Sequence, residues 1–195
     1  MAAPLTQPSV KGTLLLGVVV QVRRLVRAGR VGADELEVKL EPGDLALLEQ
    51  KILPSSWYPV SALERMLELV WAKEGGRRPE FLREQGRASA EALAAAGIYR
   101  QLAASSGRRR EPDAFGRLLC TLSSAMYDFM EWRHLGGPRG VTEVDGAADW
   151  PDVLRIATEG FIEHAVRHAG GLDVRVTSER PTRDRVVFYV EPARP

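Results

Sequence analysis

The end of the chain alternates twice between apolar and polar residues, and this pattern constrains the fold more than any other feature of the sequence. Successive side chains of a β-strand point to opposite faces of a sheet, so each alternating segment predicts a strand with one buried face. Residues 178–184, which contain Pro181, predict the loop that joins the two strands into a hairpin. The apolar positions are Leu172, Val174 and Val176 in the first segment and Val186, Phe188 and Val190 in the second.

Helices are predicted upstream of this hairpin. Asp149 can cap a helix that begins at Trp150-Pro151. Pro112 and Pro79 can each occupy the first turn of a helix, where a missing N–H costs little. Gly86, Ser89 and Ala90 are small residues in the helix that begins at Pro79, so another element can approach closely there.

The N-terminal part is also predicted to be helical. Residues 11–28 place apolar side chains at helical spacing, although the valine run 18–20 is typical of a strand; we favour the helix. Pro42 opens a short helix through Gln50. Ser61 and Glu64 have the spacing of a capping box at the start of the next helix.

Two interpretations compete for residues 127–135. Phe129 continues the helical spacing of the helix that begins at Pro112, whereas the same residues alternate as a strand would. The glycine- and proline-rich residues 136–140 predict a turn, and residues 141–144 could form the strand that returns from it. The pattern by itself leaves both interpretations open.

The composition is that of a globular protein, with 195 residues of which 45% are hydrophobic and 27% charged. We predict one α+β domain over residues 10–191, with tails at 1–9 and 192–195. A net charge of +1 provides no field that would attract nucleic acid or a membrane surface. The single cysteine, Cys120, excludes an internal disulfide and indicates a cytoplasmic protein. The apolar run 14–22 is too short for a membrane span.

Several motifs resemble an uncharacterised bacterial family that is expanded in myxobacteria. The residues from Glu159 to Glu163 and onward through Tyr189 resemble the end of 4-vinyl-reductase-type domains, which share a fold with haem nitric-oxide sensors and TRAPP vesicle-tethering subunits. The motifs that resemble the bacterial family are Ile52-Leu53-Pro54-Ser55-Ser56-Trp57-Tyr58-Pro59-Val60, Gly86-Arg87-Ala88-Ser89-Ala90-Glu91 and Gly97-Ile98-Tyr99-Arg100.

This resemblance implies an α+β fold in which a helical layer packs on a four-stranded antiparallel sheet, with the order strand–strand–helix–strand–strand at the C-terminus. It implies that residues 127–135 and 141–145 are the first strand pair. It further implies a small hydrophobic ligand, either a small molecule or a lipid, or a role as a homodimer or with another protein partner.

The sequence also departs from these relatives. Haem-binding relatives carry a proximal histidine on a helix before the sheet, and a Tyr-x-Ser-x-Arg motif. Here no histidine precedes His134, and residues 127–131 read Tyr-Asp-Phe-Met-Glu. The cysteines that often lie near the final hairpin of 4-vinyl-reductase-type domains are absent as well. We therefore expect no haem, no metal and no other cofactor.

Aromatic residues at the predicted element boundaries are the candidates for a ligand site, because an apolar body with a polar tip suits an apolar pocket that has a few polar anchors. Each of them suits an ordinary core equally well. Cys120 joins them as a candidate for modification, although a buried structural thiol is the usual role of such a residue. The candidate ligand-binding residues are Trp57, Tyr58, Tyr99, Cys120, Tyr127 and Trp132.

His164 and His168 lie four residues apart, so on a helix they share a face and could ligate a metal. A surface or helix-end role is the more common one for such histidines. The sequence contains no nucleophile elbow, P-loop or dinucleotide-binding motif, so no catalytic residue is predicted. We therefore favour a non-enzymatic sensory or regulatory domain that binds a small molecule or lipid. The alternative is a dimerisation or scaffolding module without a ligand.

Overall fold

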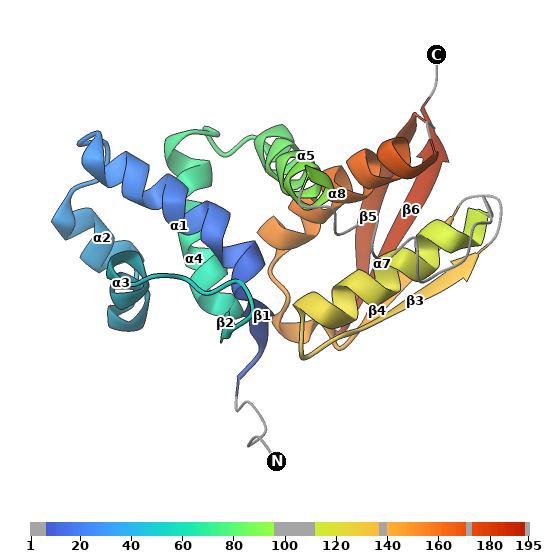
Figure 1. Cartoon of the computed structure of the whole chain (residues 1–195), viewed down its shortest axis with the longest axis horizontal. Helices are drawn as coiled ribbons and strands as arrows, with labels where there is room; N and C mark the ends of the chain where they lie inside the picture. Colours follow the sequence, from blue (N-terminus) through green and yellow to red (C-terminus); the bar gives the residue numbers. More distant parts are fainter. Residues whose placement is uncertain (1–6, 96–111, 137–139, 171–172, 194–195) are drawn as a thin grey trace. The chain divides into compact units, whose positions relative to one another are not determined.

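The computed structural model describes residues 7–95, 112–136, 140–170 and 173–193, and its contacts divide the chain into two compact units. The first unit comprises Met1–Phe81 and Met126–Asp128, and the second comprises Leu82–Ala125 and Phe129–Pro195. The single domain over residues 10–191, with its two tails, stays a prediction. Figure 1 shows the elements of both units.

The first unit combines helices with a two-stranded sheet (Figure 1). Helix α1 packs on α4, and Leu15, Val19 and Val22 on the inner face of α1 are fully buried. The predicted helix over residues 11–28 is therefore confirmed. The elements are β1 (Ser9–Lys11), α1 (Gly12–Arg27), α2 (Ala33–Lys39), α3 (Pro42–Glu49), β2 (Trp57–Pro59) and α4 (Val60–Lys73).

The second unit contains an antiparallel four-stranded sheet in the order β3-β4-β6-β5, together with helices α7 and α8 and most of α5. The predicted α+β class and the order strand–strand–helix–strand–strand are confirmed. The elements are α5 (Pro79–Ala95), α7 (Pro112–Met126), β3 (Glu131–Gly136), β4 (Val141–Asp145), the short 3-10 helix η1 (Ala147–Asp149), α8 (Asp152–Gly170), β5 (Val174–Thr182) and β6 (Arg185–Pro192).

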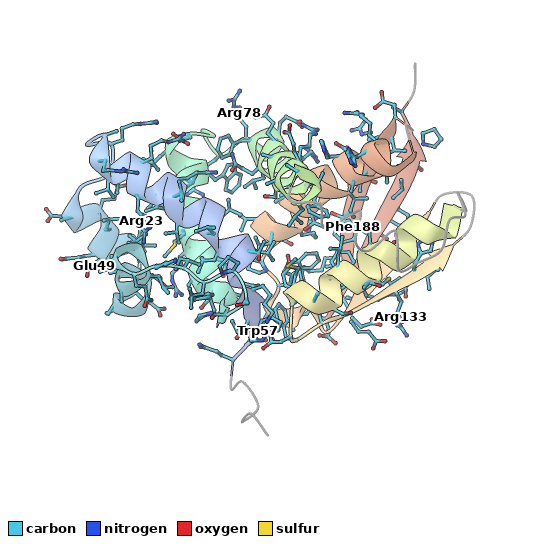
Figure 2. All side chains as sticks on the ribbon, viewed as in Figure 1. Arg23, Glu49, Trp57, Arg78, Arg133 and Phe188 are labelled. Carbon is cyan, nitrogen blue, oxygen red and sulfur yellow. The ribbon has the colours of Figure 1, made fainter. Side chains whose placement is uncertain are left out.

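Helices α7 and α8 cover the same face of this sheet. In the antiparallel register Trp132 lies opposite Val144, and Phe188 lies opposite both Thr142 and Ser178. Residues directly opposite each other point to the same side, so the even-numbered side chains share one face, which we call the inner face. Contacts from α7 to His134 and from α8 to Ser178 fall on it. The other face carries charged pairs such as the one between Arg133, which Figure 2 labels, and Asp145.

Four local predictions differ from the structure. The capping box at Ser61 is absent, because α4 begins at Val60 and its N-cap, Pro59, has no side-chain cap. The strand predicted over residues 127–135 begins only at Glu131, since the preceding helix continues to Met126 and residues 127–130 connect the two. Periodicity alone could not separate the end of the helix from the start of the strand.

The other two differences lie around the final hairpin. Asp149 belongs to η1, and α8 begins at Asp152, three residues further on. The loop predicted over residues 178–184 is mostly strand, since β5 continues to Thr182 across a register shift. Pro181 fits there because β5 is an edge strand, where a missing N–H removes no essential ladder bond.

Candidate functional site

Three of the predicted site residues gather around the first strand of the first unit. In β1, Val10 lies opposite Tyr58 of β2 and forms an isolated bridge with Tyr127 on its other side. Trp57 lies opposite Lys11, whose ammonium group sits 3.9 Å from the centre of the indole ring. The structure therefore brings Trp57, Tyr58 and Tyr127 together along one short strand.

Hydrogen bonds within the chain engage several polar groups of this region. The Tyr58 hydroxyl accepts a hydrogen bond from the Leu53 N–H at 2.9 Å. The Pro54 carbonyl accepts from both the N–H and the hydroxyl of Thr13, each at 3.1 Å. Lys11 donates to the Ser55 carbonyl at 2.9 Å. These contacts hold residues 9–13, which we call the N-terminal strap, against residues 53–58. The motif over residues 52–60 therefore has a structural role.

Trp132 lies on the inner face of the sheet in the second unit. Its ring stacks on Phe188 with centroids 5.5 Å apart and meets Trp150 edge-on at the same separation. Trp132 is 6% exposed, and its indole Nε1 is buried without a hydrogen-bond partner in the described part of the chain. A buried N–H normally finds a partner, so this donor is available to a water or to a ligand acceptor.

Cys120 lies on α7, above the same face. It is half-buried, and burial raises the pKa of its thiol, an effect only partly offset by hydrogen bonds with backbone groups of His134 and of Cys120 itself. A thiol held in its neutral form is a weak nucleophile, which favours the structural role. Tyr99 lies outside the described residues. Of the other five predicted site residues, Trp57, Tyr58 and Tyr127 belong to the first unit, and Cys120 and Trp132 belong to the second.

A pair of buried carboxylates, which were not among the predicted site residues, joins α5 to α8. Glu159 is 3% exposed and accepts a hydrogen bond from Arg83 Nε at 2.8 Å. One turn further along both helices, Glu163 is 9% exposed and accepts from Arg87 Nη2 at 2.9 Å. We call these four residues the Arg–Glu ladder. The equal four-residue spacing in the two helices was the signal available in the sequence.

Two glycines let the helices of the ladder approach each other. A Cβ atom on Gly86 would lie 1.7 Å from the Ala157 carbonyl oxygen, and one on Gly160 would lie 2.0 Å from the Arg83 carbonyl oxygen. Both obstacles are backbone atoms, which cannot move aside cheaply. The close approach predicted at Gly86 is thus confirmed, and it brings the arginines of α5 within reach of the carboxylates of α8.

The same carboxylates close the exposed edge of the sheet. Glu163 accepts a hydrogen bond from the Val176 N–H of β5 at 3.1 Å, and Glu159 accepts from the Ser178 hydroxyl at 2.5 Å. Arg155 of α8 donates to the Ser178 carbonyl at 3.1 Å. Backbone groups of an edge strand can otherwise pair with another chain, so these side chains protect β5 from such pairing.

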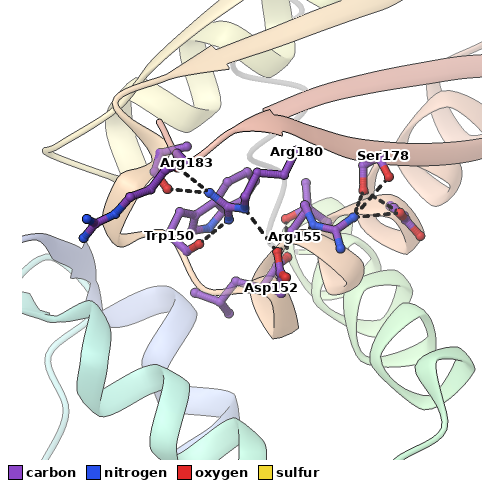
Figure 3. Close-up of polar contacts among 10 residues, drawn as sticks. Trp150, Asp152, Arg155, Ser178, Arg180 and Arg183 are labelled. Atoms are coloured by element: carbon purple, nitrogen blue, oxygen red, sulfur yellow. Dashed lines mark hydrogen bonds and ion pairs between the residues drawn. The ribbon is translucent and has the colours of Figure 1, made fainter. Parts of the chain in front are cut away.

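Arg180 fixes the start of α8 to the hairpin, as Figure 3 shows. Its guanidinium donates to the carbonyl oxygens of Ala147 at 2.8 Å, Trp150 at 2.6 Å and Arg183 at 2.9 Å. Asp152 adds an ion pair at 3.4 Å. Four of the five N–H donors of the guanidinium are thus engaged within the chain, so we assign Arg180 a structural task.

The only histidine pair of the chain lies on α8. His164 and His168 stack with ring centroids 6.2 Å apart and planes 11° from parallel. His164 is half-buried and His168 is exposed. Within the described residues no group of three or more histidines, cysteines and acidic residues is placed to hold a metal ion.

Similarity to solved structures identifies the fold of this chain. No protein-family model and no curated protein matches the sequence. Solved H-NOX structures do match: an Fe(II) unliganded H-NOX protein mutant from K. algicida superposes with a TM-score of 0.62 and 11% identity, covering 94% of this chain and 97% of that one. An S. oneidensis H-NOX mutant in the Fe(II) ligation state gives 0.58 and 13%, covering 94% and 96%. An oxygen-binding H-NOX domain related to soluble guanylate cyclases gives 0.54 and 16%, covering 95% and 96%.

This chain therefore has the fold of the H-NOX domains. The predicted kinship with haem nitric-oxide sensors is supported at the level of fold, whereas the 4-vinyl-reductase and TRAPP kinships gain no support. None of the helices in the part of the chain that the structure describes combines the length and the apolar character needed to cross a bilayer.

The residues of this chain do not fit a histidine-ligated haem. The first of its three histidines, His134, lies in β3, so no helix before the sheet offers an imidazole. The His134 ring packs against Gly116 of α7, and its Nδ1 lies 3.3 Å from the Thr142 hydroxyl. Cys120, the only thiol, is disfavoured as a thiolate ligand because burial raises its pKa.

Proposed function

We propose that this protein is a non-enzymatic sensory or regulatory domain that binds a small organic molecule or lipid rather than a histidine-ligated haem. The observation that carries the proposal is the H-NOX fold, which extends over 93–95% of the chain in the solved structures that resemble it. Those H-NOX structures include an oxygen complex and Fe(II) states. This chain has the H-NOX fold but no histidine on a helix before the sheet, and this difference supports a sensor that binds a different ligand.

The inner face of the sheet is the proposed place for this ligand. Trp132 offers a buried N–H without a protein acceptor, beside the aromatic surfaces of Phe188 and Trp150. Such a combination suits an apolar ligand with one hydrogen-bond acceptor. Of the six predicted site residues, Trp132 and Cys120 lie on or above this face. Trp57, Tyr58 and Tyr127 are proposed to stabilise the strap instead.

The second candidate function is a dimerisation or scaffolding module without a ligand. One observation favours it: α1 exposes Leu16 and Val20, which lie one turn apart and are 37% and 49% exposed. Apolar side chains on one exposed helix face are typical of a protein contact. This candidate predicts a homodimer or another protein partner, and it leaves the Trp132 N–H to a buried water.

Native mass spectrometry of protein purified from its own host separates the two candidates. The first predicts a peak heavier than the bare chain by the mass of a small organic molecule other than haem. The second predicts a bare chain in dimers or in a complex. A bare monomer would contradict both candidates. An absorption band typical of haem would contradict the inference that the residues of this chain do not fit a histidine-ligated haem.

A further inference from the structure

We propose that α1 and α2 of one chain bind α2 and α1 of a second copy of this chain in a symmetric dimer. The contact deepens the second candidate function, on whose exposed α1 face it rests, and it is independent of the ligand proposed for the inner face. Both helices belong to the first unit, and the five residues 28–32 connect them. A twofold dimer forms each contact twice, so a surface that carries two complementary halves can bind itself.

The outer face of α1 is the first half of this surface. Leu16, Val20 and Arg24 follow one another at intervals of four residues, so they lie on one face of the helix. Leu16 and Val20 are 37% and 49% exposed, and the side chain of Arg24 is 61% exposed. Arg24 and Arg30 share the carboxylate of Glu74, at 2.6 and 3.0 Å, so two positive charges meet one negative charge. The face is therefore apolar, with a surplus of positive charge at its C-terminal end.

The outer face of α2 is the second half. Val38 is 80% exposed, and Asp34, four residues before it, is exposed as well. Glu37 adds another exposed carboxylate. Glu35 instead pairs with Lys73 of α4 at 2.7 Å, which marks the side of α2 that faces its own unit. The opposite side of this short helix thus combines an apolar side chain with negative charge.

The two halves match in spacing when the helices run antiparallel. Arg24 follows Val20 by four residues, or about 6 Å along the axis of α1. Asp34 precedes Val38 by the same four residues in α2. When Val38 of one chain packs on Val20 of the other, Asp34 therefore reaches Arg24. The apolar contact removes surface from water, and the charge pair sets the direction of the helices.

The charges also favour a second copy over an anionic surface. A membrane or a nucleic acid that attracts Arg24 would repel Asp34 and Glu37, which lie on the neighbouring helix. A second copy supplies the opposite charge to both helices. This difference gives the proposal a direct test.

Sedimentation velocity of the full chain over a series of concentrations measures self-association, and we expect reversible dimers. Val20→Asp and Val38→Asp should each weaken the dimer by at least about tenfold, because each places a charge against an apolar side chain at the centre of the contact. The matched control is Leu53→Asp, which changes a side chain of similar exposure, 48%, in the same unit. It should dimerise as the wild type does. Circular dichroism checks that each variant folds.

Two charge reversals test whether the partner is a second copy. Arg24→Asp and Asp34→Arg each place like charges opposite one another in both contacts of the dimer, so each variant alone should dimerise more weakly than the wild type. An equal mixture of the two should form heterodimers, since both contacts then pair opposite charges. Recovery in the mixture supports the proposal, and a mixture that forms no more dimer than the separate variants overturns it.

The outcomes also separate this contact from the second candidate function. Dimers that neither Val20→Asp nor Val38→Asp weakens would overturn the contact and leave a dimerisation module that uses another surface. A wild type that stays monomeric up to its highest soluble concentration would overturn the contact and the homodimer together.

Discussion

The N-terminal strap and the Arg–Glu ladder secure two elements of this chain by different means. Backbone carbonyls, the Tyr58 hydroxyl and the face of the Trp57 ring hold the strap and its partner segment, through contacts that are partly exposed, such as the one between Lys11 and Ser55. In the ladder, the side chains of Glu159 and Glu163 are only 4% and 11% exposed. They lie where glycines let α5 and α8 approach each other closely. Water can replace the contacts of the strap but not those of the ladder, so single substitutions should have much larger effects in the ladder.

Gly86→Ala should cause the largest loss. The new Cβ would overlap the Ala157 carbonyl oxygen, so α5 must move away from α8 and weaken both ion pairs. We expect a loss of about 3 kcal/mol, at the upper end of overpacking effects. Urea unfolding measures it.

The matched control is Gly17→Ala in α1, where an added Cβ would meet nothing within 4 Å. It should stabilise the chain by about 0.5–1 kcal/mol, because alanine favours the helix. Equal effects of the two substitutions would show that the crossing of α5 and α8 is not tight.

Glu159→Gln should cause the next largest loss. It leaves Arg83 and Arg155, both less than one-third exposed, without the carboxylate that they share. Because the arginines are partly exposed, losing the charge of this carboxylate should cost about 2 kcal/mol, the range of a hydrogen bond to a charged group. Thermal and urea unfolding should both show the loss. A loss in the free energy of unfolding no larger than that of an exposed ion pair would contradict the stabilising role of the Arg–Glu ladder.

Tyr58→Phe should have a moderate effect in the strap. It removes the acceptor of the Leu53 N–H and leaves the ring in place. One such hydrogen bond contributes about 1 kcal/mol. Its counterpart in the second unit, Tyr189→Phe, removes an exposed contact with Glu179 and should change the free energy of unfolding very little. A larger loss from Tyr189→Phe would reverse this ranking.

The smallest effect concerns Asp152 and pH. Burial raises its pKa, but hydrogen bonds and charge from Arg155, and the charge of Arg180, outweigh this and lower it overall. A lowered pKa in the folded state means that this carboxylate stabilises the fold above its unfolded pKa of about 3.9 and loses that effect as the pH falls through the folded value. Asp152→Asn should therefore unfold slightly more easily at neutral pH and match the wild type in strong acid.

The sequence predicted the elements better than it predicted the contacts between them. Alternation found β5 and β6, and the prolines found the starts of α5 and α7, because these signals are local. The small helix α2 was missed, since its seven residues bury no side chain and carry no periodic signal. Strand β2 was also missed, because only its pairing with β1 makes it a strand.

The candidate site was the harder part. The aromatic residues were chosen for their type, and tertiary structure then distributed them between the strap and the inner face. The ladder escaped notice because charged residues four apart on a helix are usually solvated, and nothing local shows that Glu159 and Glu163 lie beneath arginines of α5. Gly86 was the useful signal, because a glycine inside a helix predicts a close neighbour.

The central claim is that the buried indole N–H of Trp132 donates to a bound small molecule. The chain has four tryptophans, and each gives one indole signal in a ¹H–¹⁵N spectrum. Stripping the ligand from host-purified protein should shift the Trp132 signal, while Trp71, bonded to the Arg78 carbonyl at 2.8 Å, should keep its position. An unchanged Trp132 signal after the ligand has been removed would contradict the account.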